Sequence, residues 1–310
     1  MVLKLQQTKP IHTQADTAWK QILDVYFKNF VDYCLPDLSR LIDWSRAWSS
    51  LDKELQSISK NNLAGKRLLD KLMKVYLLDG KEQWILVHIE VQGKPEETFP
   101  NRMLTYNYRL YDKYEKSIVS CAILTDDNKK WRPNHCKVGF AGSYLSLDYL
   151  VIKLIDYRDK LVELDASSNS FASVIFAQLK AIEARFKPDE YRKKIKFSLT
   201  KRLYEKGFSR DEICDLYRFI DWLIGLPEPL ELEYLNEVHE LEGVKQMPYI
   251  STAERLGMKL GAEQNAIKIA IGMLEEGFDR DLIARLTGLG KEKIDSLSKS
   301  EETSDWEVIE

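Results

Sequence analysis

Acidic and amide side chains on a predicted β-hairpin are the strongest candidates for chemistry in this 310-residue chain. The run WILVHIEVQ is typical of a strand, in which residues two apart share one face of the sheet. His88, Glu90 and Gln92 therefore share a face, opposite an apolar face that begins with Ile85 and Val87. A glutamate on a central strand is costly to bury without a partner, which indicates a cation or a proton nearby.

The strand before the turn carries a second carboxylate. An Asp-Gly pair at residues 79–80 predicts a hairpin turn between LLDKLMKV and WILVHIEVQ. A three-residue turn with Gly80 in the left-handed conformation would set Asp70 directly opposite Glu90. A two-residue turn would send Asp70 to the other face, and we favour the first because it aligns the apolar residues. Two facing carboxylates repel unless a cation lies between them, and oxygen ligands suit Mg²⁺ or Mn²⁺.

Two basic segments are candidates for contact with phosphates. A helix that begins near Pro100 carries, on one face, Arg102, Tyr106, Arg109 and Lys113. Residues 185–206 hold nine Lys/Arg against three acids, a local net charge of +6, with Lys193 and Lys194 near the centre. Both faces suit a phosphate backbone. The alternative for each is a solvated surface, with Tyr106 partly buried in the first.

The overall charge is nearly balanced, with 46 Lys+Arg against 49 Asp+Glu and a formal net charge of −3. This excludes the strongly basic composition that would by itself indicate a nucleic-acid-binding protein, and it leaves local basic patches open. Residues 226–244 hold six glutamates and no lysine or arginine. We expect an acidic, solvated connector at 226–250 and a disordered acidic tail at 299–310.

The four cysteines lie far apart, form no CxxC pair and have no histidine spaced to complete a zinc site. They predict buried, reduced thiols and a reducing compartment. No apolar run is long enough to cross a membrane, and the first residues lack the apolar region of a signal peptide. We therefore expect a cytoplasmic protein with no membrane partner.

The segment around the hairpin resembles the PD-(D/E)xK nuclease superfamily, and within it the branch of recombination-promoting nucleases and transposase-like proteins. The similarity rests on Asp70 in LLDKLMKV, the Asp-Gly turn and Glu90 in HIEVQ. Flanking phrases agree, namely ADTAWKQILDVYFKNF, LIDW, LDKELQ and NRMLTYNYRLYDKY. The resemblance covers roughly residues 14–130 and implies that Asp70 and Glu90 hold a metal ion in an endonuclease core.

The resemblance also implies roles for the neighbours of Glu90. The carbonyl of Val91 is a further metal contact. Gln92 stands where the superfamily has a lysine, and its neutral amide can orient the attacking water without acting as a base. Metal coordination would then have to supply the hydroxide. Accessory candidates near the site are Asp16, Lys20, Lys74 and His88.

The elements that position these residues predict an α/β fold, a central mixed sheet flanked by helices over residues 14–160. A helical extension with the basic run follows at 165–225. A helical unit at 251–298 contains a Thr-Gly-Leu turn and resembles helix-turn-helix domains. There Asp279 or Asp281 can cap the middle helix, and Lys291 and Lys293 would face a DNA groove.

We therefore expect an enzyme, a Mg²⁺- or Mn²⁺-dependent DNA endonuclease linked to recombination or transposition. RNA cleavage uses the same metal and phosphate chemistry, so the sequence does not separate the two substrates. The alternative is a catalytically impaired nuclease-fold protein that acts as a DNA-binding or oligomeric accessory factor. The amide at Gln92 favours this alternative, and the C-terminal helices are its candidates for homo-oligomer contacts.

Overall fold

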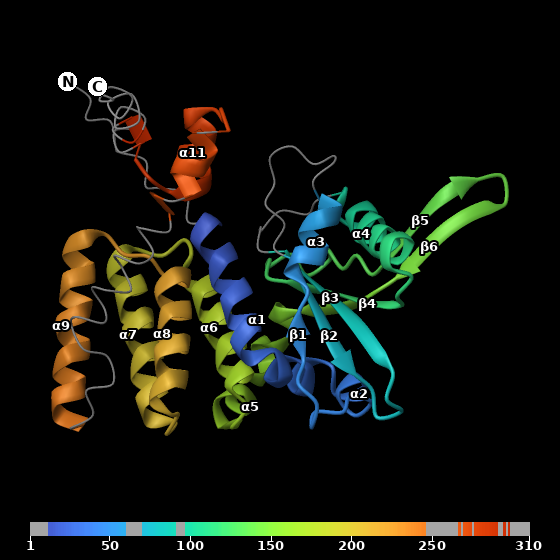
Figure 1. Cartoon of the computed structure of the whole chain (residues 1–310). Helices are drawn as coiled ribbons and strands as arrows, with labels where there is room; N and C mark the ends of the chain where they lie inside the picture. Colours follow the sequence, from blue (N-terminus) through green and yellow to red (C-terminus); the bar gives the residue numbers. More distant parts are fainter. Residues whose placement is uncertain are drawn as a thin grey trace, which may run out of the picture. The chain divides into compact units, whose positions relative to one another are not determined.

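A five-stranded mixed sheet forms the centre of the fold (Figure 1). The structure is a computed structural model that describes residues 12–59, 70–90 and 97–245, and residues 266–297 except 268, 275, 291–293 and 296. The strand order is β1-β2-β3-β4-β7, with antiparallel pairing from β1 to β3 and parallel pairing from β3 to β7. The strands are Ser49–Ser50, Asp70–Tyr76, Glu82–Glu90, Ile118–Leu124 and Leu150–Lys153. The predicted mixed sheet flanked by helices is confirmed.

The chain divides into two compact units, Asp16–Val238 and a second unit that comprises Met1–Ala15 and His239–Glu310. The helices that lie wholly in the first unit are α2 (Pro36–Ser39), α3 (Asp52–Ser59), α4 (Phe99–Tyr114), α5 (Leu161–Ala166), α6 (Ser170–Ala184), α7 (Asp189–Glu205) and α8 (Arg210–Leu223), with the 3₁₀ turn η1 (Leu154–Lys160). Helix α1 (His12–Cys34) and helix α9 (Glu228–Lys245) cross the division. Among the described residues, no helix combines the length and the apolar character needed to cross a bilayer.

Both faces of the sheet are covered. On one face, Leu72 of β2 and Leu86 of β3 pack with Leu55 of α3 and with Tyr106 and Leu110 of α4. On the other face the side chains of β2 and β3 are equally buried, among them the predicted core residues Ile85 and Val87. Continuous burial on both faces is typical of strands covered by helices on each side.

Helix α4 connects β3 to the parallel strand β4. A crossover between parallel strands is right-handed in nearly all proteins, and it places the N-terminus of its helix at the edge where the first strand ends. The edge that carries Glu90 therefore also carries the first turn of α4. This edge is where ligands bind in open α/β sheets.

Trp19 joins helix α1 to helices α6 and α8. Its indole N–H donates to the side-chain oxygen of Gln178 on α6 at 3.1 Å, in the interior. Its ring packs edge-on against Phe219 of α8, with ring centres 5.4 Å apart, and against Phe171 of α6 at 6.2 Å. The side chain of Trp19 is fully buried, so this residue belongs to the core.

The four cysteines are all free thiols. Cys121 and Cys136 are buried, and Cys34 and Cys214 are half-buried. Burial raises the pKa of the Cys34 thiol to about 12 and raises the pKa of Cys121 well above its ordinary value. These two thiols stay protonated at neutral pH. The prediction of buried thiols is confirmed for Cys121 and Cys136 and is wrong for Cys34 and Cys214, which are half-buried.

The segment that we expected to be a solvated connector contains helix α9. Three of its glutamates, Glu231, Glu233 and Glu237, form ion pairs with the basic helix α7. Lys196 of α7 lies 2.9 Å from Glu231 and 2.6 Å from Asp221 of α8. The Lys196 ammonium also lies 4.6 Å from the centre of the Tyr234 ring. The expectation failed because residues 226–244 and 185–206 balance each other across an interface, so neither charge run is simply a solvated face.

In the C-terminal unit, a small core joins helical segments around α11 (Arg280–Thr287), with Ala270, Ile283 and Ile294 fully buried. Asp279 caps α11, since its carboxylate accepts the N–H groups of Asp281 and Leu282. The predicted cap is thus confirmed for Asp279. Lys291 and Lys293 lie outside the described residues.

Replacing Lys196 by methionine should lower the free energy of unfolding by about 3 kcal/mol, because Glu231 is left buried without its cation. Chemical denaturation of the full chain measures this loss. Lys194→Met on the same helix is the matched control, because Lys194 is exposed, and its effect should stay within about 0.5 kcal/mol. Equal effects of the two substitutions would contradict the buried role of Lys196.

Candidate functional site

The two predicted metal ligands lie at the open end of the β2–β3 hairpin, Asp70 as the first residue of β2 and Glu90 as the last of β3. Asp70 pairs with His88, two residues before Glu90 on β3. The expectation that Asp70 lies directly opposite Glu90 is therefore wrong. Because the shift of two residues is even, the positions of Asp70, His88 and Glu90 still share a face of the sheet. Diagonal neighbours of this kind are about 7–8 Å apart.

The turn explains the shifted register. The ladder of β2 and β3 continues one pair beyond Tyr76 and Glu82, since the N–H of Leu77 donates to the carbonyl of Lys81 at 2.8 Å. The loop is therefore residues 78–80, which has the expected three residues but begins one residue earlier than we expected. The N–H of Gly80 donates to the carbonyl of Leu77 at 2.8 Å, and Gly80 has the expected positive φ, at 85°. The loop length and the glycine geometry were thus predictable, and the position of the loop was not.

Several predicted site residues fall outside what the structure describes. They are the side chains of Asp16, Asp70, His88 and Glu90, and the whole of Val91 and Gln92. Metal binding and catalysis by these residues stay predictions. Within the described ranges, no three histidine, cysteine, aspartate or glutamate side chains gather in a way that could hold a metal ion.

A buried ion pair lies at the same edge of the sheet. Glu90 is level with Leu124 of β4, and Leu124 is level with Lys153 of β7, so Lys153 shares the face of Glu90 two strands away. The Lys153 ammonium lies 2.5 Å from Asp126, and both side chains are at most 1% exposed. The other oxygen of Asp126 accepts the backbone N–H of Asn128 at 2.9 Å.

Of this ion pair, the sequence indicated a structural role for Asp126 only. The Asp-Asp-Asn turn after β4 predicts a turn role for Asp126, which the bond to Asn128 confirms. Lys153 gave no signal, because a lysine at the end of a short strand is ordinary. A single sequence does not reveal that the two side chains are buried together.

The ion pair is linked to the first turn of α4 through Trp131. The Trp131 ring lies 5.4 Å from the Lys153 ammonium and packs edge-on against Phe99, with ring centres 5.5 Å apart. Phe99 is the first residue of α4 and is fully buried. The Lys153–Asp126 pair therefore helps to fix the helix start beside the edge that carries Glu90.

The predicted phosphate-binding stripe of α4 faces α3. Tyr106 is fully buried in the core, so it is not a surface contact. Arg109 donates to the carbonyl of Ile58 at 3.1 Å, and Lys113 donates to the hydroxyl of Ser57 at 2.8 Å. Packing against α3 thus uses most of the stripe.

Arg102 differs from the rest of the stripe by its position. It lies in the first turn of α4, half-buried, with its guanidinium 5.3 Å from the Phe99 ring centre. Lys113 lies eleven residues further along, about 16 Å away on a helix that rises 1.5 Å per residue. Of the four stripe residues, Arg102 is the one placed near the edge of Glu90.

The basic run on α7 is largely neutralised by acids of this chain. Lys193 lies 2.6 Å from Glu233 and 3.2 Å from Glu237, and hydrogen bonds to these two carboxylates raise the pKa of Lys193. Lys194 is exposed. Contact with a phosphate is therefore open to Lys194, whereas Lys193 would first have to leave its acidic partners.

The accessory lysines are placed differently. Lys20 of α1 is half-buried. Lys74 shares the face of Asp70, but it lies four residues further along β2, paired with Trp84 and 3.9 Å from the carboxylate of Glu82. This position is at the far side of the hairpin from Glu90, which removes Lys74 as a neighbour of the proposed metal.

Lys71, next to Asp70 in sequence, holds the start of β2. Its ammonium lies 2.5 Å from Asp24 of α1 and 2.6 Å from Asp52 of α3, and its side chain is only 4% exposed. The buried ammonium of Lys71 thus connects helices α1 and α3 to the start of β2, next to Asp70. The sequence pattern missed this role.

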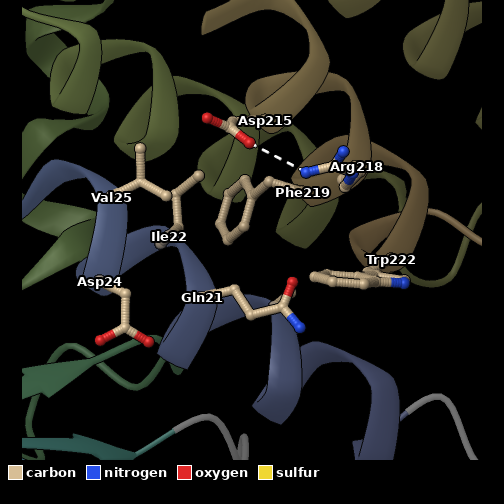
Figure 2. Close-up of a pocket in the computed structure, with 9 residues that line it drawn as sticks. Gln21, Ile22, Asp24, Val25, Asp215, Arg218, Phe219 and Trp222 are labelled. Carbon is tan, nitrogen blue, oxygen red and sulfur yellow. Dashed lines mark hydrogen bonds and ion pairs between the residues drawn. The ribbon is translucent and has the colours of Figure 1, made fainter. Parts of the chain in front are cut away.

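A separate hollow of about 200 Å³ lies between α1 and α8. Figure 2 shows Ile22 and Phe219 in it beside polar side chains, with Arg218 next to Asp215 at 3.0 Å. Burial raises the pKa of the Asp215 carboxyl. None of the predicted site residues lines this hollow, which is also bounded by Ala18, Gln21, Asp24, Val25 and Trp222.

The C-terminal unit gives the match to known proteins. Residues 263–299 match the family model for the Rpn/YhgA-like nuclease family, C-terminal HTH domain. This match supports the resemblance to the recombination-promoting nucleases and supports a helix-turn-helix in this unit. It covers only the C-terminal part, so the nuclease core itself rests on the fold and the residues above. Comparison with curated proteins and with solved structures gives no significant match.

Replacing Lys153 by methionine should lower the free energy of unfolding by about 3–5 kcal/mol, because Asp126 is left as an unpaired buried charge. The double substitution Lys153→Met with Asp126→Leu should recover part of this loss, since it removes both charges. Thermal and chemical denaturation measure the two effects.

The Arg132–Asp156 ion pair is a matched control for this prediction. It lies in the same region, at 2.6 Å, but both side chains are nearly half exposed. Arg132→Ala should therefore cost less than about 1 kcal/mol. A Lys153→Met variant as stable as Arg132→Ala would show that the buried pair does not hold this edge.

Proposed function

We propose that this chain is a metal-dependent DNA endonuclease linked to recombination, related to the Rpn/YhgA-like nuclease family. The match of residues 263–299 to a domain of that nuclease family carries the proposal. The mixed sheet also supports it, because the positions of Asp70 and Glu90 lie on the same face and at the same end of the sheet. We also propose that the protein works in the cytoplasm.

The donor chemistry of the proposed site fits a hard divalent cation. Asp70 and Glu90 offer carboxylate oxygens and Val91 offers a carbonyl, the ligand types that Mg²⁺ and Mn²⁺ prefer. When bound, such an ion would neutralise charge on the scissile phosphate and lower the pKa of a water molecule. Gln92 would orient that water and donate its amide N–H to a phosphate oxygen.

The first turn of α4 would complete the phosphate site. Helix N-termini present backbone N–H groups and a partial positive charge, which favour phosphate. Arg102 adds a full positive charge in the same turn. The substrate backbone would then lie across the edge between β3 and the start of α4.

The C-terminal unit would supply DNA affinity. Its match to a helix-turn-helix domain supports a DNA partner, and a compact core with a capped α11 gives it a stable helical frame. Such domains place one helix in the major groove. We propose that this unit binds the DNA that the core cleaves.

Asp70→Asn and Glu90→Gln should each reduce Mg²⁺-dependent nicking of plasmid DNA by more than about a hundredfold, since each removes a metal ligand while keeping the side-chain size. The rate of conversion of supercoiled to nicked plasmid measures this. Asp79→Asn is the matched control, because Asp79 lies half exposed in the turn of the same hairpin. It should cleave at the parental rate.

The alternative, a DNA-binding accessory factor without catalysis, is favoured by one observation, the amide at Gln92. Titration calorimetry with Mn²⁺ separates the two. Heat from Mn²⁺ binding that is lost in Glu90→Gln supports the nuclease. Retained DNA binding without any heat from Mn²⁺, and without cleavage of DNA or RNA, would establish the accessory factor instead.

A further inference from the structure

A two-stranded hairpin outside the main sheet has no role so far. Strands β5 (His135–Phe140) and β6 (Ser143–Asp148) form it, and Figure 1 shows it projecting beyond α4, away from the five-stranded sheet. Its tip is a two-residue turn, Ala141-Gly142, with φ values of 50° and 90°. Positive φ at both turn residues matches the twist of the strands. Gly139 within β5, next to Phe140, also has a positive φ, at 141°.

One face of the ribbon is an apolar stripe that runs out of the core. The register puts Cys136 and Leu147 on this face at the base, where Cys136 is buried and Leu147 packs against the cluster of Phe99 and Met103. Further out, Val138 and Leu145 are paired and nearly half exposed, and Phe140 at the tip is 86% exposed. A two-stranded ribbon is barely stable alone in water, so an exposed apolar face of this kind indicates a partner.

The charges around the ribbon are mostly positive. Lys137 lies on the opposite face, 3.9 Å from the centre of the Tyr144 ring. Lys129 and Lys130 are exposed in the loop that leads into β5. Two acids in this region are also exposed, Asp127 in the loop and Asp148 at the end of the ribbon, and Asp148 lies 2.6 Å from His135. Three exposed lysines, two before the base of the ribbon and one within β5, complement phosphates along a duplex that the apolar tip would enter.

A second copy of the chain fits this face less well. Val138, Phe140 and Leu145 together expose on the order of 300 Å², so a twofold pair of ribbons would bury about 600 Å², half of the roughly 1,200 Å² of a small specific interface. Duplex DNA needs no such area, because its affinity comes mainly from phosphate contacts. The shape also agrees, since a two-stranded ribbon fits a DNA groove.

We propose that the β5–β6 hairpin is a DNA-binding arm. Phe140 enters between two base pairs as an apolar wedge, and Lys129, Lys130 and Lys137 contact the flanking phosphates. This proposal rests on DNA as the partner in the proposed function. It adds a second contact, on the core itself, to the contact made by the C-terminal unit. The chain reaches the arm directly from the end of β4, next to the proposed cleavage site.

The wedge is tested with a 30-base-pair duplex that carries 2-aminopurine, whose fluorescence rises when its base is unstacked. Titration with the full chain should raise the fluorescence. Phe140→Ala should abolish that rise and weaken binding about tenfold. Phe186→Ala is the matched control, because Phe186 is equally exposed, at 87%, but lies outside the arm. It should behave as the parent.

The lysines are tested by salt dependence. Replacing Lys129, Lys130 and Lys137 together by alanine should reduce the slope of log affinity against log salt by about 3. All variants change exposed residues, and circular dichroism verifies their fold.

Three outcomes would overturn the proposal that the β5–β6 hairpin is a DNA-binding arm. In the first, the parent binds the duplex and Phe140→Ala matches it in both affinity and fluorescence; the proposed nuclease then stands. In the second, light scattering shows a parent dimer that Phe140→Ala dissociates while the fluorescence response is unchanged, which assigns the face to a second copy. In the third, the parent binds no DNA, which removes the DNA partner of the proposed function as well.

Discussion

The register of β3 with its two neighbours is the constraint on which the proposed site depends. β3 is antiparallel to β2 and parallel to β4, so its residues are fixed from both sides. A slip of one residue on either side would turn Glu90 to the opposite face and move buried residues such as Leu86 into a part of the core that is packed around other side chains. Burial of both faces makes such a slip expensive. The geometry of the edge is thus set by the core below it.

Buried lysines fasten the elements around this sheet. Lys71 binds α1 and α3 to the start of β2, Lys153 binds the loop after β4, and Lys196 binds α8 and α9 to α7. Replacing such pairs by apolar side chains is often neutral for stability, so their value lies in specifying one arrangement. In this chain two of the three hold segments next to Asp70 or Glu90. The ion pairs therefore position the edge more than they stabilise the fold.

The sequence predicted features that depend on local chemistry. Gly80 at positive φ, the cap at Asp279 and the apolar face of Ile85 follow from turn, capping and periodicity rules, and the structure confirms them. Features that depend on distant partners were missed or misread.

The two charged segments are examples of features that depend on distant partners. The acids of α9 and the bases of α7 lie about forty residues apart, and only folding shows that Lys193 meets Glu233. Tyr106 likewise matched a basic stripe by spacing, although α3 covers that face. The loop begins one residue earlier than expected, which changes the partner of Asp70 by two residues and so keeps Asp70 on the same face. The face on which Asp70 lies was predictable, because side chains alternate between the two faces along a strand. Its exact partner on β3 was not predictable.

The balance of formal charge at the edge argues for a cation there. Asp126 and Lys153 cancel each other. Lys71 is outnumbered by its partners Asp24 and Asp52, and Arg102 is outnumbered by Asp70 and Glu90, so these six groups sum to −2. A phosphate backbone would be repelled by that charge. The divalent cation that we propose would cancel it, and the carboxylates that would repel DNA alone would then no longer do so.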